Sequence, residues 1–486
     1  MNSNDLTLLT DLYELTMMQG YHLTGLENKV VVFDLFYRKN PCDNGYAIAA
    51  GLQQAIEYIT NLHFSSEDIA YLESLGLFSK DFISYLSTFR FTGEIYAIPE
   101  GTVVFPQEPL MRIKAPIMEA QLIETALLNI INHQSLIATK AARVVWAAQG
   151  DPIMEFGLRR AQGPDAGTLG ARAAVIGGCC GTSNVLTGKL FDVPVKGTHA
   201  HSWVMSFPDE LTAFREYAKL FPNACTLLVD TYNTLESGVP NAITVFREMR
   251  EAGIPLKNYG IRLDSGDLAY LSKQAKKMLE DAGFPDAVIS ASSDLDEYLI
   301  ASLKLQEAKI GLWGVGTKLI TSDDCPAFGG VYKLAAESTE NGEFIPKIKL
   351  SNNTEKVTNP GIKKVVRIYD KATGKIKADL IALDDEVFDE SKPLTLFDDS
   401  AKWKRMTLPA GSFTIRELLV PIFIDGKCVY ESPKVMDIQA YCNKEKDTLW
   451  DEHKRLDNPH IVPVDLSEKL SILKANLIEE ISKLKQ

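Results

Sequence analysis

The sequence predicts an α/β protein whose middle part is built from parallel βαβ units. Between about Asp151 and Lys333, short apolar stretches alternate with stretches of helical periodicity, which is the pattern of strands joined by crossover helices. The chain has 486 residues, too many for one compact domain, so we expect two or three packed units. The candidate strands of the middle part are Pro152–Phe156, Ala174–Ile176, Ala224–Val229, Tyr259–Leu263, Val288–Ser290 and Ile310–Val315.

The first third of the chain combines helices and strands and predicts an α+β unit. Leu8–Tyr13 opens an amphipathic helix, whereas Val30–Phe36 is rich in β-branched residues and predicts a strand. Apolar residues keep helical spacing from Met118 to Ala148. Further expected elements are a helix over Gly51–Leu62, a helix starting near Ser65, and strands over Gly93–Gly101 and Pro109–Ile113.

The last part of the chain is rich in Lys and Asp beyond Ser351. It contains a strand-like segment at Lys363–Tyr369, a loop around Asp384–Pro393 and a helical pattern after Pro463. We therefore expect an N-terminal domain over residues 1–135, a barrel-like domain over 136–350 and a C-terminal region over 351–486.

Composition excludes several classes of function. A formal net charge of −13 argues against sequence-independent binding to nucleic acid, which needs a basic surface. The seven cysteines are scattered without a C-x-x-C pair, which favours a reducing compartment. The polar start and the lack of a long apolar stretch predict neither a signal peptide nor a membrane span. We expect a cytoplasmic protein.

Two histidines stand among small residues in Gly197–Ser202, directly after the strand-like Val193–Val195. A histidine in such a loop acts as a nucleophile, a base or a metal ligand, or it only holds a turn. Metal ligation by His199 and His201 is disfavoured, because neither an H-E-x-x-H helix nor a cysteine partner accompanies them. On spacing alone, a structural and a chemical role both stay open.

A second cluster follows the predicted strand that ends at Glu155. Arg159 and Arg160 suit bidentate recognition of carboxylate or phosphate, and Phe156 offers a face for a flat ring. The alternative is a loop in which both arginines are ion-paired.

Two further clusters follow later strands. Arg262–Asp267 adds an arginine and two carboxylates, although its Asp-Ser-Gly-Asp run also suits a helix N-cap. Gly314–Lys318 places a glycine turn before a hydroxyl and an ammonium group, which is compatible with phosphate binding but matches no nucleotide-binding fingerprint. Catalytic groups of β/α barrels collect at the carboxyl ends of strands. Together the four clusters predict a pocket for a planar anion and phosphates.

The spaced motifs, taken in order, resemble nicotinate phosphoribosyltransferases. The resemblance runs from about Leu8 to the C-terminal region and is least clear after about Asp384. It implies an irregular α/β barrel of the type II phosphoribosyltransferase kind packed on an α/β sandwich domain, with a C-terminal extension, in a head-to-tail homodimer with shared active sites. The motifs are Leu9–Met17, Glu155–Arg160, Gly197–His201, Arg262–Asp267 and Gly314–Thr317.

The resemblance also implies the activity, which is ATP-coupled synthesis of nicotinate mononucleotide and pyrophosphate from nicotinate and 5-phosphoribosyl 1-pyrophosphate, with Mg²⁺, in NAD biosynthesis. It implies that His201 is phosphorylated from ATP, and that Asp264 lies near the ribose hydroxyls or the magnesium. Tyr13 of the neighbouring subunit and Phe156 would stack on the pyridine ring. Of the other implied roles, nicotinate carboxylate binding falls to Thr198 and Arg262, contacts near the base and ribose phosphate to Arg159 and Arg160, and 5-phosphate binding to Gly314, Gly316 and Thr317.

The choice between acid and amide substrates depends on position 183. Related nicotinamide enzymes resemble this chain but carry an Asp where Ser183 stands, so Ser183 favours the acid. A nicotinamide phosphoribosyltransferase is the first alternative, followed by a quinolinate enzyme, a catalytically silent binder of pyridine nucleotides and a metal-dependent aldolase. The roles of Lys347, Lys349 and Lys364 stay open between phosphate binding and a solvated basic stretch.

Overall fold

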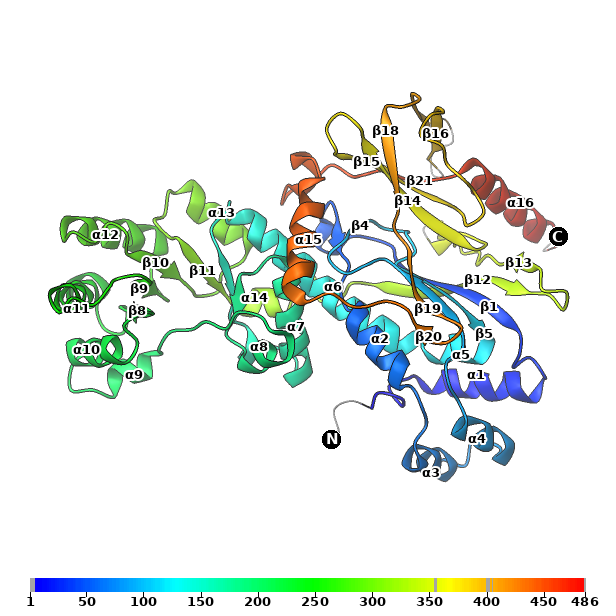
Figure 1. The fold of residues 1–486 in the computed structure, drawn as a ribbon, viewed down its shortest axis with the longest axis horizontal. Coiled ribbons are helices and arrows are strands. Elements are labelled where there is room, and N and C mark those ends of the chain that lie inside the picture. Colours follow the sequence, from blue (N-terminus) through cyan, green and yellow to red (C-terminus); the bar gives the residue numbers. More distant parts are fainter. Residues whose placement is uncertain (1–4, 354–355, 399–402, 404, 485–486) are drawn as a thin grey trace. The chain divides into compact units, whose positions relative to one another are not determined.

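The computed structural model describes residues 5–353, 356–398, 403 and 405–484 (Figure 1). Contacts divide the chain into two compact units. Unit 1 comprises Met1–Leu136, Ala327–Pro433 and Ala440–Gln486, and unit 2 comprises Ile137–Pro326 and Lys434–Gln439. The second division falls before the boundary expected at residue 350, because the strand that follows it pairs with an N-terminal strand of unit 1.

Unit 1 contains a seven-stranded sheet, a six-stranded sheet and a small two-stranded sheet. The strand orders are β13-β12-β1-β5-β3-β19-β20, β17-β16-β21-β15-β14-β18 and β2-β4. The strands are β1 (Val30–Tyr37), β2 (Ala47–Ile48), β3 (Glu94–Ala97), β4 (Val103–Val104), β5 (Met111–Pro116), β12 (Gly330–Ser338), β13 (Phe344–Pro346), β14 (Lys363–Asp370), β15 (Ile376–Leu383), β16 (Leu394–Phe397), β17 (Arg405–Leu408), β18 (Phe413–Glu417), β19 (Val420–Ile424), β20 (Lys427–Cys428) and β21 (Val464–Leu466).

Helices of unit 1 pack on the seven-stranded sheet and flank the C-terminal strands. Two of them, α6 and α15, cross the division between the units. None of the helices in the described part of the chain is long and apolar enough to cross a membrane. The helices are α1 (Leu12–Leu23), α2 (Leu52–Asn61), α3 (Ser66–Ser74), α4 (Lys80–Ser87), α5 (Ile117–Leu122), α6 (Glu124–Ala147), α15 (Val435–Asp447) and α16 (Glu468–Leu484), with short 3-10 turns η1 (Pro41–Asp43) and η5 (Asp451–Lys454).

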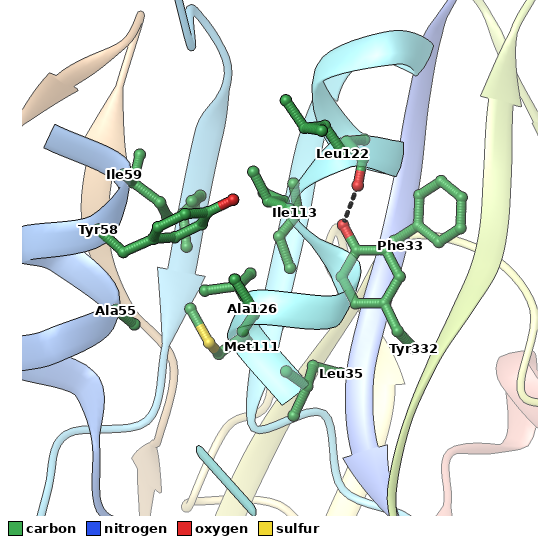
Figure 2. Packing of buried hydrophobic residues seen from close by; sticks show 14 of the residues in the cluster. Phe33, Leu35, Ala55, Tyr58, Ile59, Met111, Ile113, Leu122, Ala126 and Tyr332 are labelled. Atoms are coloured by element: carbon green, nitrogen blue, oxygen red, sulfur yellow. Dashed lines mark hydrogen bonds between the residues drawn. The ribbon is translucent and has the colours of Figure 1, made fainter. Parts of the chain in front are cut away.

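The core of unit 1 lies between the seven-stranded sheet and its helices (Figure 2). Tyr58 of α2 reaches toward Ile113 of β5, and both are buried. Phe33 of β1 stacks on Tyr332 of β12 with ring centroids 4.7 Å apart, and the Tyr332 hydroxyl donates a 2.7 Å hydrogen bond to the Ala120 carbonyl. Each buried side chain of this size contributes about 1.5–3 kcal/mol, so the core can hold residues from both ends of the chain together.

Unit 2 is a parallel sheet with the strand order β7-β6-β11-β10-β9-β8. With one exception, each strand pairs with the next one along the chain, and β11 pairs with β6 to close the ring. Among these described strands, β7 and β8 are the only neighbours in chain order that do not pair. The sheet is therefore an open barrel. Its strands are β6 (Ile153–Glu155), β7 (Gly181–Thr182), β8 (Cys225–Leu228), β9 (Tyr259–Leu263), β10 (Val288–Ala291) and β11 (Leu312–Val315).

The predicted strand Ala174–Ile176 is wrong, because these residues lie in helix α7. A run of three apolar residues does not by itself distinguish a strand from a buried helix. Gly177 ends this helix against α6, where an added Cβ would lie 2.3 Å from the Ala138 carbonyl oxygen. Figure 1 shows α10, α11 and α12 beside β8, β9 and β10. The unit 2 helices are α7 (Pro164–Gly177), α8 (Val185–Phe191), α9 (His201–Met205), α10 (Glu210–Leu220), α11 (Val239–Glu251), α12 (Leu268–Asp281), α13 (Glu297–Leu305) and α14 (Thr317–Ile320), with short turns η2 (Leu158–Arg160) and η3 (Thr234–Gly238).

The segment Val193–His199 fills the opening between β7 and β8. Thr182 of β7 donates a backbone hydrogen bond to Pro194 and accepts one from Lys196, both at 3.0 Å. At the other edge, the Leu228 amide of β8 donates to His199 Nε2 at 3.2 Å. The segment that carries the histidine motif thus replaces the missing strand pairing and is held from both sides.

Candidate active site

The predicted site residues of unit 2 lie at or beyond the carboxyl ends of its strands, except that Thr198 belongs to the closing segment and His201 begins α9. Because the strands of this sheet are parallel, these ends lie along one edge. Residues from β8, β9, β10 and the closing segment Val193–His199 form one hydrogen-bonded group there. The structure therefore joins residues that are far apart in the sequence into a single cluster.

Arg262 lies at the centre of this cluster, near the end of β9. Its side chain is only 16% exposed. Nη1 donates to Thr198 Oγ1 at 2.9 Å, Nε donates to Ser292 Oγ at 2.9 Å, and Nη2 lies 3.2 Å from Asp264 Oδ1. A guanidinium held in this way has a fixed plane and can present its remaining N–H edge to a bound carboxylate.

Asp264 also faces His201, the first residue of α9. His201 Nε2 lies 3.7 Å from Asp264 Oδ2, and Nδ1 lies 3.1 Å from Thr231 Oγ1. The side chains of His201 and Asp264 are 40% and 28% exposed, respectively. An accessible imidazole beside a carboxylate is suited to proton transfer or to nucleophilic attack.

His199 differs from His201 because it is buried. Its Nε2 accepts the hydrogen bond from the Leu228 amide, and its Nδ1 lies 3.4 Å from the Ala200 carbonyl. The ring packs on Tyr217 with centroids 4.6 Å apart. Burial, with smaller effects from Arg262 and His201, lowers the His199 pKa to about 4. His199 is therefore neutral at pH 7, with its proton on Nδ1, and it has a structural role.

Phe156 follows β6 and is seated against β11. Its amide donates to the Val315 carbonyl at 2.8 Å. A Cβ at Gly314 would lie 2.5 Å from the Phe156 ring, so the ring position requires glycine there. Gly316 lies close to the Phe156 carbonyl and precedes Thr317, the first residue of α14. The structure thus brings Phe156 and the glycine turn together.

Arg159 and Arg160 lie exposed in η2. Their exposure leaves both guanidinium groups accessible to a ligand. Tyr13 lies in α1 of unit 1 and is 47% exposed, which argues against a core role. Burial and its hydrogen bond with Glu14 raise the Tyr13 pKa, so the phenol is neutral at pH 7.

Asp230 is a site residue that the sequence analysis did not single out. Its Oδ2 accepts hydrogen bonds from the Asp264 amide at 2.8 Å and from Ser265 Oγ at 2.7 Å. Its Oδ1 is buried and has no hydrogen-bond partner within the described residues. The sequence feature that could have identified it is the position of Asp230 and Thr231 directly after the predicted strand Ala224–Val229.

Other polar residues of the motifs have structural roles. Asp267 caps α12, since its side chain accepts from the Tyr270 amide at 3.0 Å. Glu155 is buried and accepts from Thr182 Oγ1 at 2.6 Å, and burial raises its pKa. In unit 1, Lys347 pairs with Glu337 and Lys364 with Glu417. The described residues contain no group of three or more His, Cys, Asp or Glu side chains arranged to hold a metal.

The fold and the site together define an α/β-barrel protein with a hydrogen-bonded cluster of Arg262, His201 and Asp264 at the carboxyl edge of its sheet. Comparisons with known proteins identify which one. The N-terminal domain model of nicotinate phosphoribosyltransferase matches residues 8–132, the family model matches 152–322 and the C-terminal domain model matches 362–474. The chain belongs to the nicotinate phosphoribosyltransferase family.

Individual relatives agree with this assignment. The chain is 49% identical over 478 residues to nicotinate phosphoribosyltransferase of Bacillus subtilis strain 168, covering 98% of this chain and 96% of that protein. It is 36% identical to the Caenorhabditis elegans enzyme, over 95% and 92% of the two chains. The crystal structure of human nicotinic acid phosphoribosyltransferase superposes with a TM-score of 0.84 at 29% identity, over 96% of this chain and 99% of that one. This match confirms the expected fold class.

Proposed function

We propose that this enzyme makes nicotinate mononucleotide and pyrophosphate from nicotinate and 5-phosphoribosyl 1-pyrophosphate, with ATP hydrolysis driving C–N bond formation, for NAD biosynthesis in the cytoplasm. The observation that carries the proposal is the oriented Arg262, which is held by Thr198, Ser292 and Asp264 beside the accessible His201. These groups supply a carboxylate receptor and a reactive imidazole at one edge of the sheet.

The largely buried Arg262 favours an acid over an amide. A guanidinium about 4 Å from a carboxylate contributes about 4 kcal/mol at an effective dielectric near 20, before desolvation is subtracted. Ser183, at the end of β7, adds no negative charge that would repel a carboxylate. We infer that Arg262 and Thr198 bind the nicotinate carboxylate, and that Phe156 stacks on the pyridine ring.

The phosphoribosyl group would bind at the neighbouring strand ends. Gly316 and Thr317 lead into α14, and first-turn N–H groups of a helix have no intrahelical partner. We assign the 5-phosphate to Gly314, Gly316 and Thr317, and the exposed Arg159 and Arg160 to the region of the base and the ribose phosphate. Cations there offset the charge of the substrate.

Displacement of pyrophosphate builds positive charge at C1 of the ribose and negative charge on the leaving group. Mg²⁺, when bound, stabilises that leaving group. Proteins hold Mg²⁺ with one or two carboxylates and substrate phosphates, and Asp264 and Asp230 fit this requirement, because Asp230 Oδ1 is unpaired within the described residues. These carboxylates would hold the ion, while Arg262 orients the base toward C1.

ATP coupling is assigned to His201. Its Nε2 faces Asp264 and its Nδ1 is oriented by Thr231, so the imidazole has a defined orientation and remains accessible. Phosphorylation would add two negative charges beside the site and favour a different binding state. This supports a cycle in which ATP hydrolysis drives formation of the mononucleotide.

The family implies a homodimer, and we propose that Tyr13 acts in the active site of the neighbouring subunit. The support from this chain is an exposed aromatic side chain on α1. An aromatic pair of this kind contributes about 0.5–1.5 kcal/mol beyond burial.

The test is to measure mononucleotide formation from phosphoribosyl pyrophosphate and Mg²⁺ with nicotinate, nicotinamide or quinolinate, each with and without ATP. We expect turnover of nicotinate alone, stimulated by ATP. Preference for nicotinamide would overturn the assignment of the acid substrate. Binding of pyridine nucleotides without any turnover would indicate a silent member of the family.

A further inference from the structure

We propose that Ser292 is a positioning residue that fixes Arg262 and Asp264 relative to each other and thereby sets the preference for a carboxylate substrate. The inference rests on the proposed function of Arg262. Ser292 follows β10 and is itself buried. Its backbone amide serves the barrel sheet, whereas its hydroxyl contacts the side chains of Arg262 and Asp264.

The backbone places this hydroxyl between the two charged side chains. Ser292 N donates to the Leu263 carbonyl at 2.9 Å, which continues the pairing of β10 with β9. Side chains two residues apart on a strand point to the same face. Arg262 and Asp264, the residues on either side of Leu263, therefore project on the face where Ser292 can reach both.

The hydroxyl of Ser292 serves both neighbours at once. It accepts a 2.9 Å hydrogen bond from Arg262 Nε and donates a hydrogen bond to Asp264 Oδ1. A hydroxyl can accept and donate simultaneously, whereas a guanidinium only donates and a carboxylate only accepts. The buried Ser292 thus links two charged groups, and loss of its hydroxyl leaves both of them with one hydrogen bond fewer.

This link determines which atoms face the substrate. Nε is held by Ser292 and Nη1 by Thr198, so the guanidinium plane cannot rotate about its long axis without breaking one of these bonds. Asp264 Oδ1 is occupied by Ser292 and Arg262, which directs Oδ2 to His201. Ser292 therefore orients both the carboxylate receptor and the partner of the histidine.

The same strand offers a matched control. Ser290 is also buried and pairs with Arg262 across the strands, but its hydroxyl donates to the Ile261 backbone carbonyl at 3.0 Å instead of to a charged side chain. The experiment compares Ser292→Ala, Ser292→Thr and Ser290→Ala in the full-length enzyme. The readouts are KM and kcat for nicotinate, the ratio of nicotinate to nicotinamide turnover, and the thermal midpoint.

We expect Ser292→Ala to raise the KM for nicotinate roughly tenfold or more, because hydrogen bonds to two charged groups are lost. The nicotinate to nicotinamide ratio should fall with it, and Ser292→Thr, which keeps the hydroxyl, should restore most of both. Ser290→Ala should leave KM and the ratio unchanged. If Ser292→Ala does not fold, Ser292→Cys keeps the volume with only weak hydrogen bonding and should give the same kinetic change.

A second comparison tests whether Ser292 acts through Arg262. In an Arg262→Lys background, which lacks Nε, the added Ser292→Ala change should have less than half its effect on KM for nicotinate. Additive effects, or a wild-type KM in Ser292→Ala and Ser292→Cys, would overturn the inference while the wild-type enzyme still turned over nicotinate. A wild-type enzyme that did not use nicotinate would instead reject the proposed function.

Discussion

His199 and His201 are two residues apart, yet their surroundings give them opposite properties. His199 accepts a backbone hydrogen bond from β8 and packs on Tyr217, whereas His201 is accessible and lies between Thr231 and Asp264. A buried neutral imidazole is a poor nucleophile for a large substrate, while an oriented and accessible one is suitable. We therefore propose that His201 carries the chemistry of the motif.

Substitution of each histidine should separate the two roles. We expect His201→Asn to lose ATP stimulation and ATP hydrolysis while it keeps a slow uncoupled reaction. His199→Asn should keep the ratio of ATP hydrolysed to mononucleotide formed, but with a lower free energy of unfolding, because the packed ring is lost. Equal loss of coupling in both variants would contradict the assignment.

The buried His199 also predicts a pH dependence of stability. Burial lowers its folded-state pKa to about 4, below the ordinary histidine value of 6.5, so the unfolded chain binds a proton more readily. The stability that this neutral histidine contributes is present above pH 6.5 and is lost as the pH falls toward 4. The loss is on the order of 2–3 kcal/mol. Urea unfolding of the wild type and of His199→Asn between pH 7 and 4 measures this loss. If the free energies of unfolding of the two proteins changed in parallel with pH, the predicted contribution of His199 would be rejected.

At the scale of elements, the end of β9 shows how one short segment combines chemistry with helix formation. Arg262 and Asp264 extend from the strand end into the site, whereas Asp267 caps α12 three residues later. The Asp-Ser-Gly-Asp run thus contains the expected N-cap at Asp267, while the role of Asp264 in the reaction stays a prediction. Gly266 joins them with a φ of 76°, a conformation that favours glycine.

The two aspartates should respond differently to substitution. Asp267→Ala removes the N-cap and should lower the free energy of unfolding by about 0.5–2 kcal/mol with little change in kcat. Asp267→Asn, which retains a capping oxygen, is the control and should be close to wild type. Asp264→Asn should reduce kcat with a small effect on the thermal midpoint. A kcat loss in Asp267→Ala as large as that in Asp264→Asn would show that the roles are not separate.

At the scale of the whole molecule, two units are formed from interleaved parts of the chain. Unit 2 is nearly continuous, so its barrel is formed from contacts between neighbouring βαβ units. Unit 1 requires β12 to pair with β1 across most of the sequence. Tyr13, which is predicted to act in the active site of the neighbouring subunit, belongs to unit 1, whereas the Arg262 cluster belongs to unit 2.

The proposed shared active sites predict complementation between subunits. Tyr13→Ala and His201→Asn should each have low ATP-coupled activity alone. When they are unfolded and refolded together in equal amounts, half of the dimers should be mixed, and one of the two sites in each should carry both native residues. Recovery of about a quarter of the wild-type activity is expected. No recovery in mixtures shown to contain mixed dimers would place Tyr13 outside the neighbouring site.

The sequence by itself determined the class of fold and named the residues of the candidate site, because strand ends and their polar residues are local features. Arg262, His201, Asp264 and the glycine turn could be identified from runs that contain them, and the strands near them agree closely with the structure. A short apolar run such as Ala174–Ile176 was misassigned, since its helical state depends on packing of Gly177 against α6.

Only the tertiary structure decided which residues act together. Asp230, Thr231 and Ser292 carry no distinctive motif, and their roles arise from hydrogen bonds to residues on other strands. The division between His199 and His201 likewise depends on β8, which buries one ring and leaves the other accessible. Local sequence specifies which groups a strand end offers, but burial and hydrogen bonding between strands exist only after the barrel has formed.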